Sequence, residues 1–349
     1  MRNCGTDLSL GLRVPDHVQR LWGQYSPWHP VDEYVSPPKH CKVTRLHRHG
    51  ARYPAKTDGV QYGGSIQHLA SPHKFVESNL DFLKDYRYDM GEEDLIPFGA
   101  SATSMPRVMA TAGNWTVGFS AASHQRYNPN VNVVISESRN STLQNDCPNA
   151  GEGSAEMGEW LSIFGPLIAA RLNKAAPGAD LNEMDIFNVM AMFPFETLAT
   201  ENTSPLFCRL FTDDDFRAFE YDGDVEKYYK TGYGKPLGPV QGIGYVNELL
   251  SRLSDSPVQD HTTHNFSLHY SPHQTIYADF SHDNLMVAEP SVCSIFPRMR
   301  SIRAKCLTNN GVWVASRILH HGLRSVVAFM EIQGYARRDG DSDFEKCFN

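Results

Sequence analysis

The sequence lacks an apolar run long enough to cross a membrane, and it lacks an apolar stretch near its start. The longest apolar run, LSIFGPLIAA at 161–170, has about half the length that a bilayer requires and contains Gly165 and Pro166. The opening residues, MRNCGTDLSLGLRVPDH, contain no apolar core of a secretory signal. We therefore expect no membrane contact, and the sequence itself shows no export signal.

A positive net charge is also missing. The 349 residues include 32 Lys and Arg against 40 Asp and Glu, which gives a net charge of -8. Such an acidic chain has no general electrostatic footprint for nucleic acid, so we expect no nucleic-acid partner. With 41% hydrophobic and 21% charged residues, the chain can bury a substantial core and can form more than one compact domain.

Cysteine pairs with the spacing of zinc or redox motifs are absent. The seven cysteines are scattered, which is typical of long-range disulfides in an oxidising compartment, although buried free thiols would give the same pattern. They are Cys4, Cys41, Cys147, Cys208, Cys293, Cys306 and Cys347. Four glycosylation sequons are consistent with export, at Asn114, Asn140, Asn202 and Asn265.

Short β-rich segments alternate with long helical ones. Strands are predicted for CKVTRLH from Cys41, for VNVVISES at 131–138 and for QTIYADF at 274–280. Helices are predicted over 154–175, over 181–193, after a capping Thr212, and over 240–253. Strands separated by long helical stretches favour an α/β sheet with an inserted helical subdomain. The segment 289–312 has mixed signals and is not assigned.

One basic cluster, TRLHRHGARYP at 44–54, stands out in this acidic chain. Arg48 and Arg52 flank His49, and arginine is the side chain that grips phosphate through two parallel hydrogen bonds. The flanking positive charges favour the neutral, nucleophilic form of His49 at mildly acidic pH. An Arg-His-Gly triplet alone would indicate a surface loop. The second arginine and Pro54 at fixed offsets favour a phosphate site suited to transfer through a phosphohistidine.

A second pair of polar residues, His282 and Asp283, directly follows the strand predicted at 274–280. Residues at the carboxyl ends of parallel strands share one crevice. His282 can therefore add a phosphate donor, and Asp283 can protonate the leaving oxygen. On spacing alone, a His-Asp pair is a weak signal.

A metal site is not expected. Fixed arginines beside His47 and His49 would repel a divalent cation, and the acids at 213–215 fit the first turn of a helix. Four further histidines have no ligand spacing and are expected in solvated loops, namely His261, His264, His269 and His273.

The segments RHGARYP and YADFSHDN together resemble the paired signatures of the histidine acid phosphatases, closest to the fungal phytase branch. The resemblance runs almost end to end, through LWGQYSPW, GNWTVGFSAAS, VVISES, GPLIAARLN, FPFETLA, YGKPLGPVQGIGYVNELLSRL and YARRDGDSDFEKCF. It implies an α/β fold: a phosphoglycerate-mutase-like sheet flanked by helices, with a smaller helical domain. The implied catalytic domain comprises 1–55, 105–150 and 265–349, and the mainly helical cap comprises 56–104 and 151–264.

The resemblance also implies an activity. It implies a secreted, glycosylated, monomeric phosphomonoesterase without cofactor or metal, acting on myo-inositol hexakisphosphate (phytate) or related small phosphate esters. The implied roles are a nucleophile, His49; ligands of the scissile phosphate, Arg48, Arg52 and His282; a general acid, Asp283; and a disulfide, Cys147 with Cys347.

The sequence departs from the family pattern at two informative places. Ser101 stands about where the family has another phosphate-binding arginine. Phe193 replaces a family cysteine, so Cys208 loses its expected partner. The alternative hypothesis is therefore a degenerate, non-catalytic phosphate-binding member of the same family. A mutase of the superfamily is disfavoured, because the segments outside the site resemble phytases.

Overall fold

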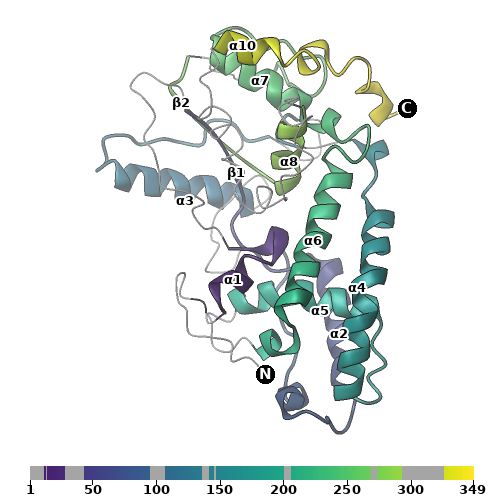
Figure 1. Ribbon diagram of the computed structural model, residues 1–349. Helices are drawn as coiled ribbons and strands as arrows, with labels where there is room; N and C mark the ends of the chain where they lie inside the picture. Colours follow the sequence, from purple (N-terminus) through teal and green to yellow (C-terminus); the bar gives the residue numbers. More distant parts are fainter. Residues whose placement is uncertain are drawn as a thin grey trace. The chain divides into compact units, whose positions relative to one another are not determined.

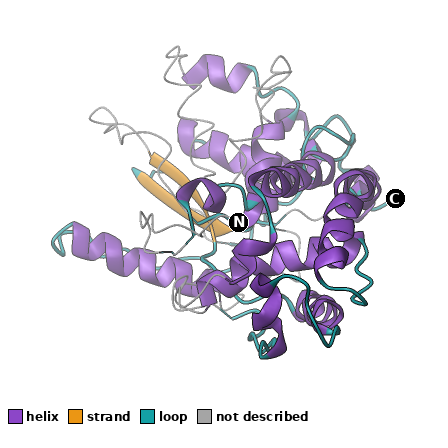
Figure 2. Ribbon diagram, turned by 60° about the horizontal axis from the view of Figure 1, so that its bottom comes forward, coloured by secondary structure: helices purple, strands orange, loops and turns teal. Residues whose placement is uncertain are grey.

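The computed structural model describes residues 12, 14–27, 43–94, 107–135, 141–144, 147–199, 206–268, 273–292 and 326–349. The described chain mixes helices with one small sheet, and most of it is helical, in agreement with the expected α/β class (Figures 1 and 2). None of the described helices is long and apolar enough to span a bilayer. Ser101, Asn140 and Asn202 lie outside the described residues, as do Cys4, Cys41, Cys293 and Cys306.

The chain forms two compact units. The helical unit comprises Met1–Pro27, Gly50–Ala100 and Ser154–Val225, and the sheet unit comprises Trp28–His49, Ser101–Gly153 and Glu226–Asn349. Their division into a catalytic domain and a cap stays a prediction.

The helical unit contains a short α1 (Asp16–Gln19) and three long helices, which are α2 (Lys56–Ala70), α4 (Ser154–Ala175) and α5 (Glu183–Ala199). Its described residues also form 3-10 segments at Gly23–Tyr25, Ser78–Lys84 and Leu206–Leu210. The helix predicted at 154–175 is confirmed as α4. The next begins at Glu183 and continues through Pro194 to Ala199, beyond the predicted end at 193.

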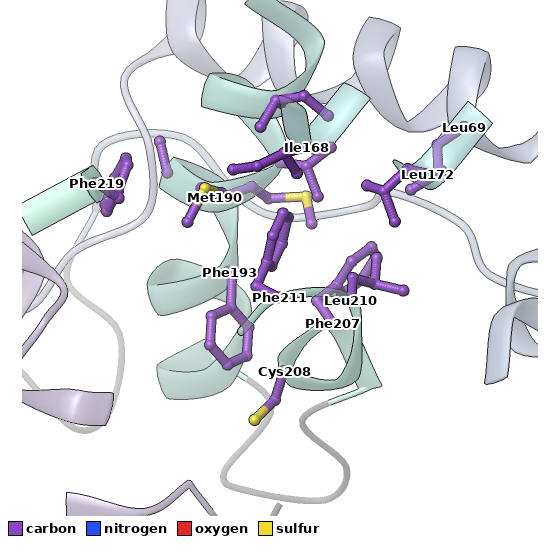
Figure 3. Close-up of a cluster of buried hydrophobic side chains, with 14 of the residues drawn as sticks. Leu69, Ile168, Leu172, Met190, Phe193, Phe207, Cys208, Leu210, Phe211 and Phe219 are labelled. Atoms are coloured by element: carbon purple, nitrogen blue, oxygen red, sulfur yellow. The ribbon is translucent and has the colours of Figure 1, made fainter. Parts of the chain in front are cut away.

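Helix α5 is the centre of the helical core, because almost all of its side chains from Ile186 to Leu198 are buried. It packs against α2 and α4. Phe193, which replaces the family cysteine, is completely buried and meets Trp22 edge to face, with the ring centroids 5.4 Å apart. Cys208 lies in the same apolar cluster (Figure 3). A phenyl ring therefore occupies core space at the position where the family has a thiol.

Helix α6 (Asp213–Lys230) runs from the helical unit into the sheet unit. Thr212 and Asp215 cap its start reciprocally. The Asp215 N–H donates to Thr212 Oγ1 at 3.2 Å, and the Thr212 N–H donates to Asp215 Oδ2 at 2.7 Å. The prediction that Thr212 caps a helix opened by acidic residues is confirmed.

The sheet unit is built on two parallel strands, β1 (Val43–Arg48) and β2 (Ile276–Ser281), paired so that Arg48 lies opposite Ser281. Its described residues form the helices α3 (Arg107–Ala122), α7 (Ile243–Ser254), α8 (Asp283–Val292) and α10 (Val326–Glu331). They also form 3-10 segments at Pro148–Ala150, Pro239–Gly242, Ala336–Arg338 and Glu345–Cys347. Helix α3 packs against β2, and α8 packs against β1 and α7 (Figure 1).

The strands predicted at 41–47 and 274–280 are confirmed within two residues, but the strand predicted at 131–138 is wrong over its described part. Residues 131–135 form no ladder, and Val131 and Val134 are exposed. Their β-branched side chains suit a buried strand, yet they find no burial here. The helix predicted at 240–253 begins only at Ile243, after a 3-10 turn.

A disulfide joins Cys147 to Cys347, the pair that the resemblance implies, across 200 residues of sequence. Both cysteines are buried in an apolar cluster with Ile243 and Val246 of α7, so the C-terminal segment is fixed to the sheet unit. Among the described sequons, Asn114 is exposed on α3 and Asn265 lies in a turn.

Candidate active site

The two basic signatures meet at the carboxyl ends of β1 and β2. Immediately after the strands, the His49 N–H donates to the Ser281 carbonyl at 3.1 Å, which extends the pairing by one residue. The rings of His49 and His282 then lie edge to face, with centroids 5.4 Å apart. His49 is 9% exposed, so its ring is largely enclosed. Two histidines far apart in sequence are thus neighbours at the strand ends, as the strand-end argument predicts.

Asp283 is the first residue of α8, where the helix dipole favours a negative charge. Its Oδ2 lies 3.7 Å from Arg48 Nη2 and 2.8 Å from Lys227 Nζ. Burial by itself raises the pKa of Asp283. The positive charge of Arg48 lowers this pKa, as do the charge and hydrogen bond of Lys227 and the charge of His49. These effects outweigh burial, so the pKa of Asp283 is held well below its usual range. Asp283 is therefore a carboxylate in the substrate-free site.

Lys227 is the residue that sequence reasoning missed. It lies near the end of α6 and is only 5% exposed. Its Nζ donates to Asp283 and also to Asn284 Oδ1 at 2.8 Å, and Glu226 Oε1 is 3.4 Å away. Burial lowers the pKa of Lys227, but the negative charges of Asp283 and Glu226 raise it by a larger amount, so the net shift is upward. In the sequence, Lys227 is one of two lysines in the last turn of a helix, a position that ordinarily satisfies the helix dipole.

Arg52 belongs to the helical unit. Its Nη1 donates to the carbonyl of Tyr53 at 2.8 Å, and its guanidinium carbon lies 5.9 Å from the centre of the Phe195 ring. The predicted role of Arg52 as a phosphate ligand stays a prediction.

A buried ion pair supports β2 two residues before its end. Arg252 of α7, 5% exposed, contacts both carboxylate oxygens of Asp279, with Nη2 to Oδ1 at 3.2 Å. The hydroxyl of Tyr245 donates to Asp279 Oδ2 at 2.9 Å. Burial alone lowers the pKa of Arg252, but Asp279 raises it overall, so the guanidinium stays charged. The pair ties α7 to the strand that delivers His282 and Asp283.

The expectation that the downstream histidines are solvated is wrong for one of them. The side chain of His264 is 6% exposed, and its Nδ1 lies 2.7 Å from Glu248 Oε1, which also accepts from Thr142 Oγ1 at 2.8 Å. The partner carboxylate, on α7, makes this burial possible. His261 and His273 are exposed as expected, and His269 lies outside the described residues.

Three comparisons with known proteins found relatives of this chain. The family described as "Histidine phosphatase superfamily (branch 2)" matches residues 97–292. Phytase A of Aspergillus oryzae is 36% identical over 340 residues, covering 82% of this chain and 73% of that protein; for Phytase A of Aspergillus fumigatus the values are 34%, 82% and 73%. Among solved structures, the phytase from D. castellii superposes with a TM-score of 0.56 over 84% of this chain and 72% of its own, at 17% identity. This last likeness supports the expected fold.

Proposed function

Because the chain belongs to branch 2 of the histidine phosphatase superfamily and is therefore a phosphatase, we propose that it hydrolyses phytate or related phosphate monoesters through a phosphohistidine, outside the cell. The observation that carries the mechanism is the enclosed His49 beside His282, with Arg48 and Asp283 in contact at the same strand ends. The substrate is suggested by the relatives named Phytase A. The long-range disulfide fits an oxidising compartment.

In the first step, Arg48, Arg52 and His282 hold the scissile phosphate by charge-assisted hydrogen bonds. A ring nitrogen of His49 attacks phosphorus and forms the nitrogen–phosphorus bond while the ester oxygen–phosphorus bond breaks. Asp283 gives its proton to the departing oxygen, which leaves as an alcohol.

In the second step, water attacks the phosphorus of the phosphohistidine and the nitrogen–phosphorus bond breaks. The Asp283 carboxylate takes the proton of the attacking water. This proton leaves with the phosphate product, because Asp283 is a carboxylate in the empty site. The sum is one ester and one water giving one alcohol and one phosphate.

The first proton on Asp283 must arrive with the substrate, because Asp283 is a carboxylate in the empty site. A phosphate monoester has a second pKa of about 6, so in acid it binds as a monoanion that carries a proton. Its negative charge also raises the proton affinity of the neighbouring carboxylate. The proposed enzyme therefore works in acid and loses activity above neutral pH.

The test is phosphate release from phytate and from an aryl phosphate near pH 5, with a chelator present, by the wild type and by His49→Ala. We expect the variant to lose activity by about a thousandfold or more, as when the nucleophile of a covalent mechanism is removed. Rapid quenching of the wild type in alkali with radiolabelled substrate should trap label on the protein that is stable in alkali and is lost in acid. A folded His49→Ala protein with full activity would refute the mechanism. A folded wild type that binds phosphate without turnover would support the degenerate, phosphate-binding alternative.

A further inference from the structure

We propose that Lys227 is a positioning residue for this reaction: it fixes Asp283 in place as a carboxylate until a phosphate ester binds, and so sets the pH at which activity on alkyl phosphates falls off. The proposal rests on the proposed function, because it concerns how the acid of that reaction is controlled.

The ammonium group of Lys227 is surrounded by oxygen atoms of the protein. Lys227 Nζ donates to two consecutive residues at the start of α8, reaching Asp283 Oδ2 and Asn284 Oδ1 at 2.8 Å each. The third neighbour is Glu226 Oε1 at 3.4 Å. An ammonium has three donors, so all of them are directed at oxygen atoms of the protein. A side chain that is 5% exposed and held in this way has little freedom to move.

Charged and titratable groups surround Asp283 from several elements of the fold. Arg48 and His49 face it from the end of β1, Lys227 faces it from α6, and His282 precedes it in the chain. Helix α7, which packs against α8, places Tyr245 near Glu289, further along α8. Two fixed cations therefore act on this one carboxylate.

The two cations differ in how they hold the carboxylate. Lys227 is hydrogen-bonded at 2.8 Å, whereas Arg48 lies 3.7 Å away. A phosphate group can attract Arg48 by offering paired oxygen acceptors that suit a guanidinium. The phosphate then weakens the Arg48 contact and adds its own negative charge, and both changes favour protonation of Asp283. Lys227 stays in place and keeps the acid aligned.

The effect of Asp283 protonation on the rate depends on the leaving group of the ester. An alkoxide needs a proton as the phosphorus–oxygen bond breaks, whereas a nitrophenolate is stable enough to leave without one. A change in the proton affinity of Asp283 must therefore appear with alkyl esters and much less with aryl esters.

The experiment measures the rate of alcohol release in a single turnover at saturation, as a function of pH, for the wild type and Lys227→Met, with glycerol 2-phosphate and p-nitrophenyl phosphate as substrates. This rate reports the ionisation of Asp283 in the substrate complex. Methionine keeps much of the volume of lysine but removes its charge. For the alkyl ester, we expect the alkaline limb to move to higher pH by about one unit, the lower end of the effect of one adjacent charge. For the aryl ester, we expect a much smaller shift. Glu226→Gln is the matched control, because it changes a neighbouring residue but retains Lys227. The alkaline limb of its pH–rate profile should not move to higher pH.

An unchanged limb, or equal shifts for both substrates, would overturn the proposal and leave Lys227 a structural residue. If Lys227→Met does not fold, a second measurement on a different variant tests the proposal. In His49→Ala carrying ¹³C-labelled aspartate, the carboxyl signal of Asp283 should titrate at higher pH with inorganic phosphate bound than without it. No difference would refute the proposal.

The results for His49→Ala and Lys227→Met distinguish a failure of the proposed function from a failure of the role of Lys227. If His49→Ala keeps wild-type activity, the proposed function fails, whatever Lys227 does. If His49→Ala is inactive and the limb of Lys227→Met does not move, only the role of Lys227 fails.

Discussion

Replacing His47 by phenylalanine should make the protein more resistant to acid. His47 lies on β1, two residues before His49, and its ring stacks on Phe280 of β2 with centroids 5.1 Å apart and planes 15° apart. Burial, and next the charge of Arg45, lower the pKa of His47 from 6.5 to about 4, although Asp279 opposes them. Phenylalanine can keep the stacking but cannot take up a proton.

The sign and size of the effect follow from proton linkage. Between pH 6.5 and about pH 4, the unfolded chain binds a proton at His47 and the folded chain does not. The free energy of unfolding therefore falls as the pH is lowered through this window, and the loss is complete below about pH 4. A shift of roughly 2.5 units at about 1.4 kcal/mol each gives a loss of up to about 3 kcal/mol from this one side chain.

The assay is urea unfolding of the wild type and His47→Phe at pH 7 and at pH 4. The wild type should lose up to about 3 kcal/mol more than the variant between the two pH values. His73→Phe, at an exposed position, controls for the loss of one histidine in general. Equal losses in wild type and His47→Phe would refute the reasoning, as would an NMR titration of His47 with a midpoint near 6.5.

Two further substitutions test packing contacts of the sheet unit, one against α8 and one at β2. Gly242→Ala should destabilise the protein by about 1–3 kcal/mol in urea, because its Cβ would lie 2.7 Å from the backbone of α8. Gly113→Ala in α3, where a Cβ meets nothing within 4 Å, should instead be neutral or stabilising by up to about 1 kcal/mol, and a loss at both positions would contradict this explanation. Asp279→Asn removes the charge of the main partner of the buried Arg252 and leaves only the longer contact to Glu248, at 3.5 Å. It should lower the free energy of unfolding by up to about 3 kcal/mol, and a thermal midpoint equal to that of the wild type would show that the pair contributes little.

Local chemistry made several elements predictable from the sequence. The period of apolar residues defined α4, and the pairing of Thr212 with nearby acids defined the start of α6, because both depend on residues within a few positions of each other. Both signature segments end a strand, so the meeting of His49 and His282 could also be anticipated. The strand prediction failed at 131–135 because it depended on distant parts of the chain: β-branched residues favour a strand only where neighbouring elements bury them.

The sequence by itself therefore determined the family, the α/β class and the residue types that a phosphate site needs. Only the tertiary structure decided the ionisation of that site. Asp283 is a carboxylate because Arg48, at the end of β1, and Lys227, near the end of α6, both lie beside it. His264 is buried because Glu248 lies within hydrogen-bond distance of its ring. Charge interactions depend on distance and on burial, and the linear order of residues specifies neither for groups that are far apart in the chain.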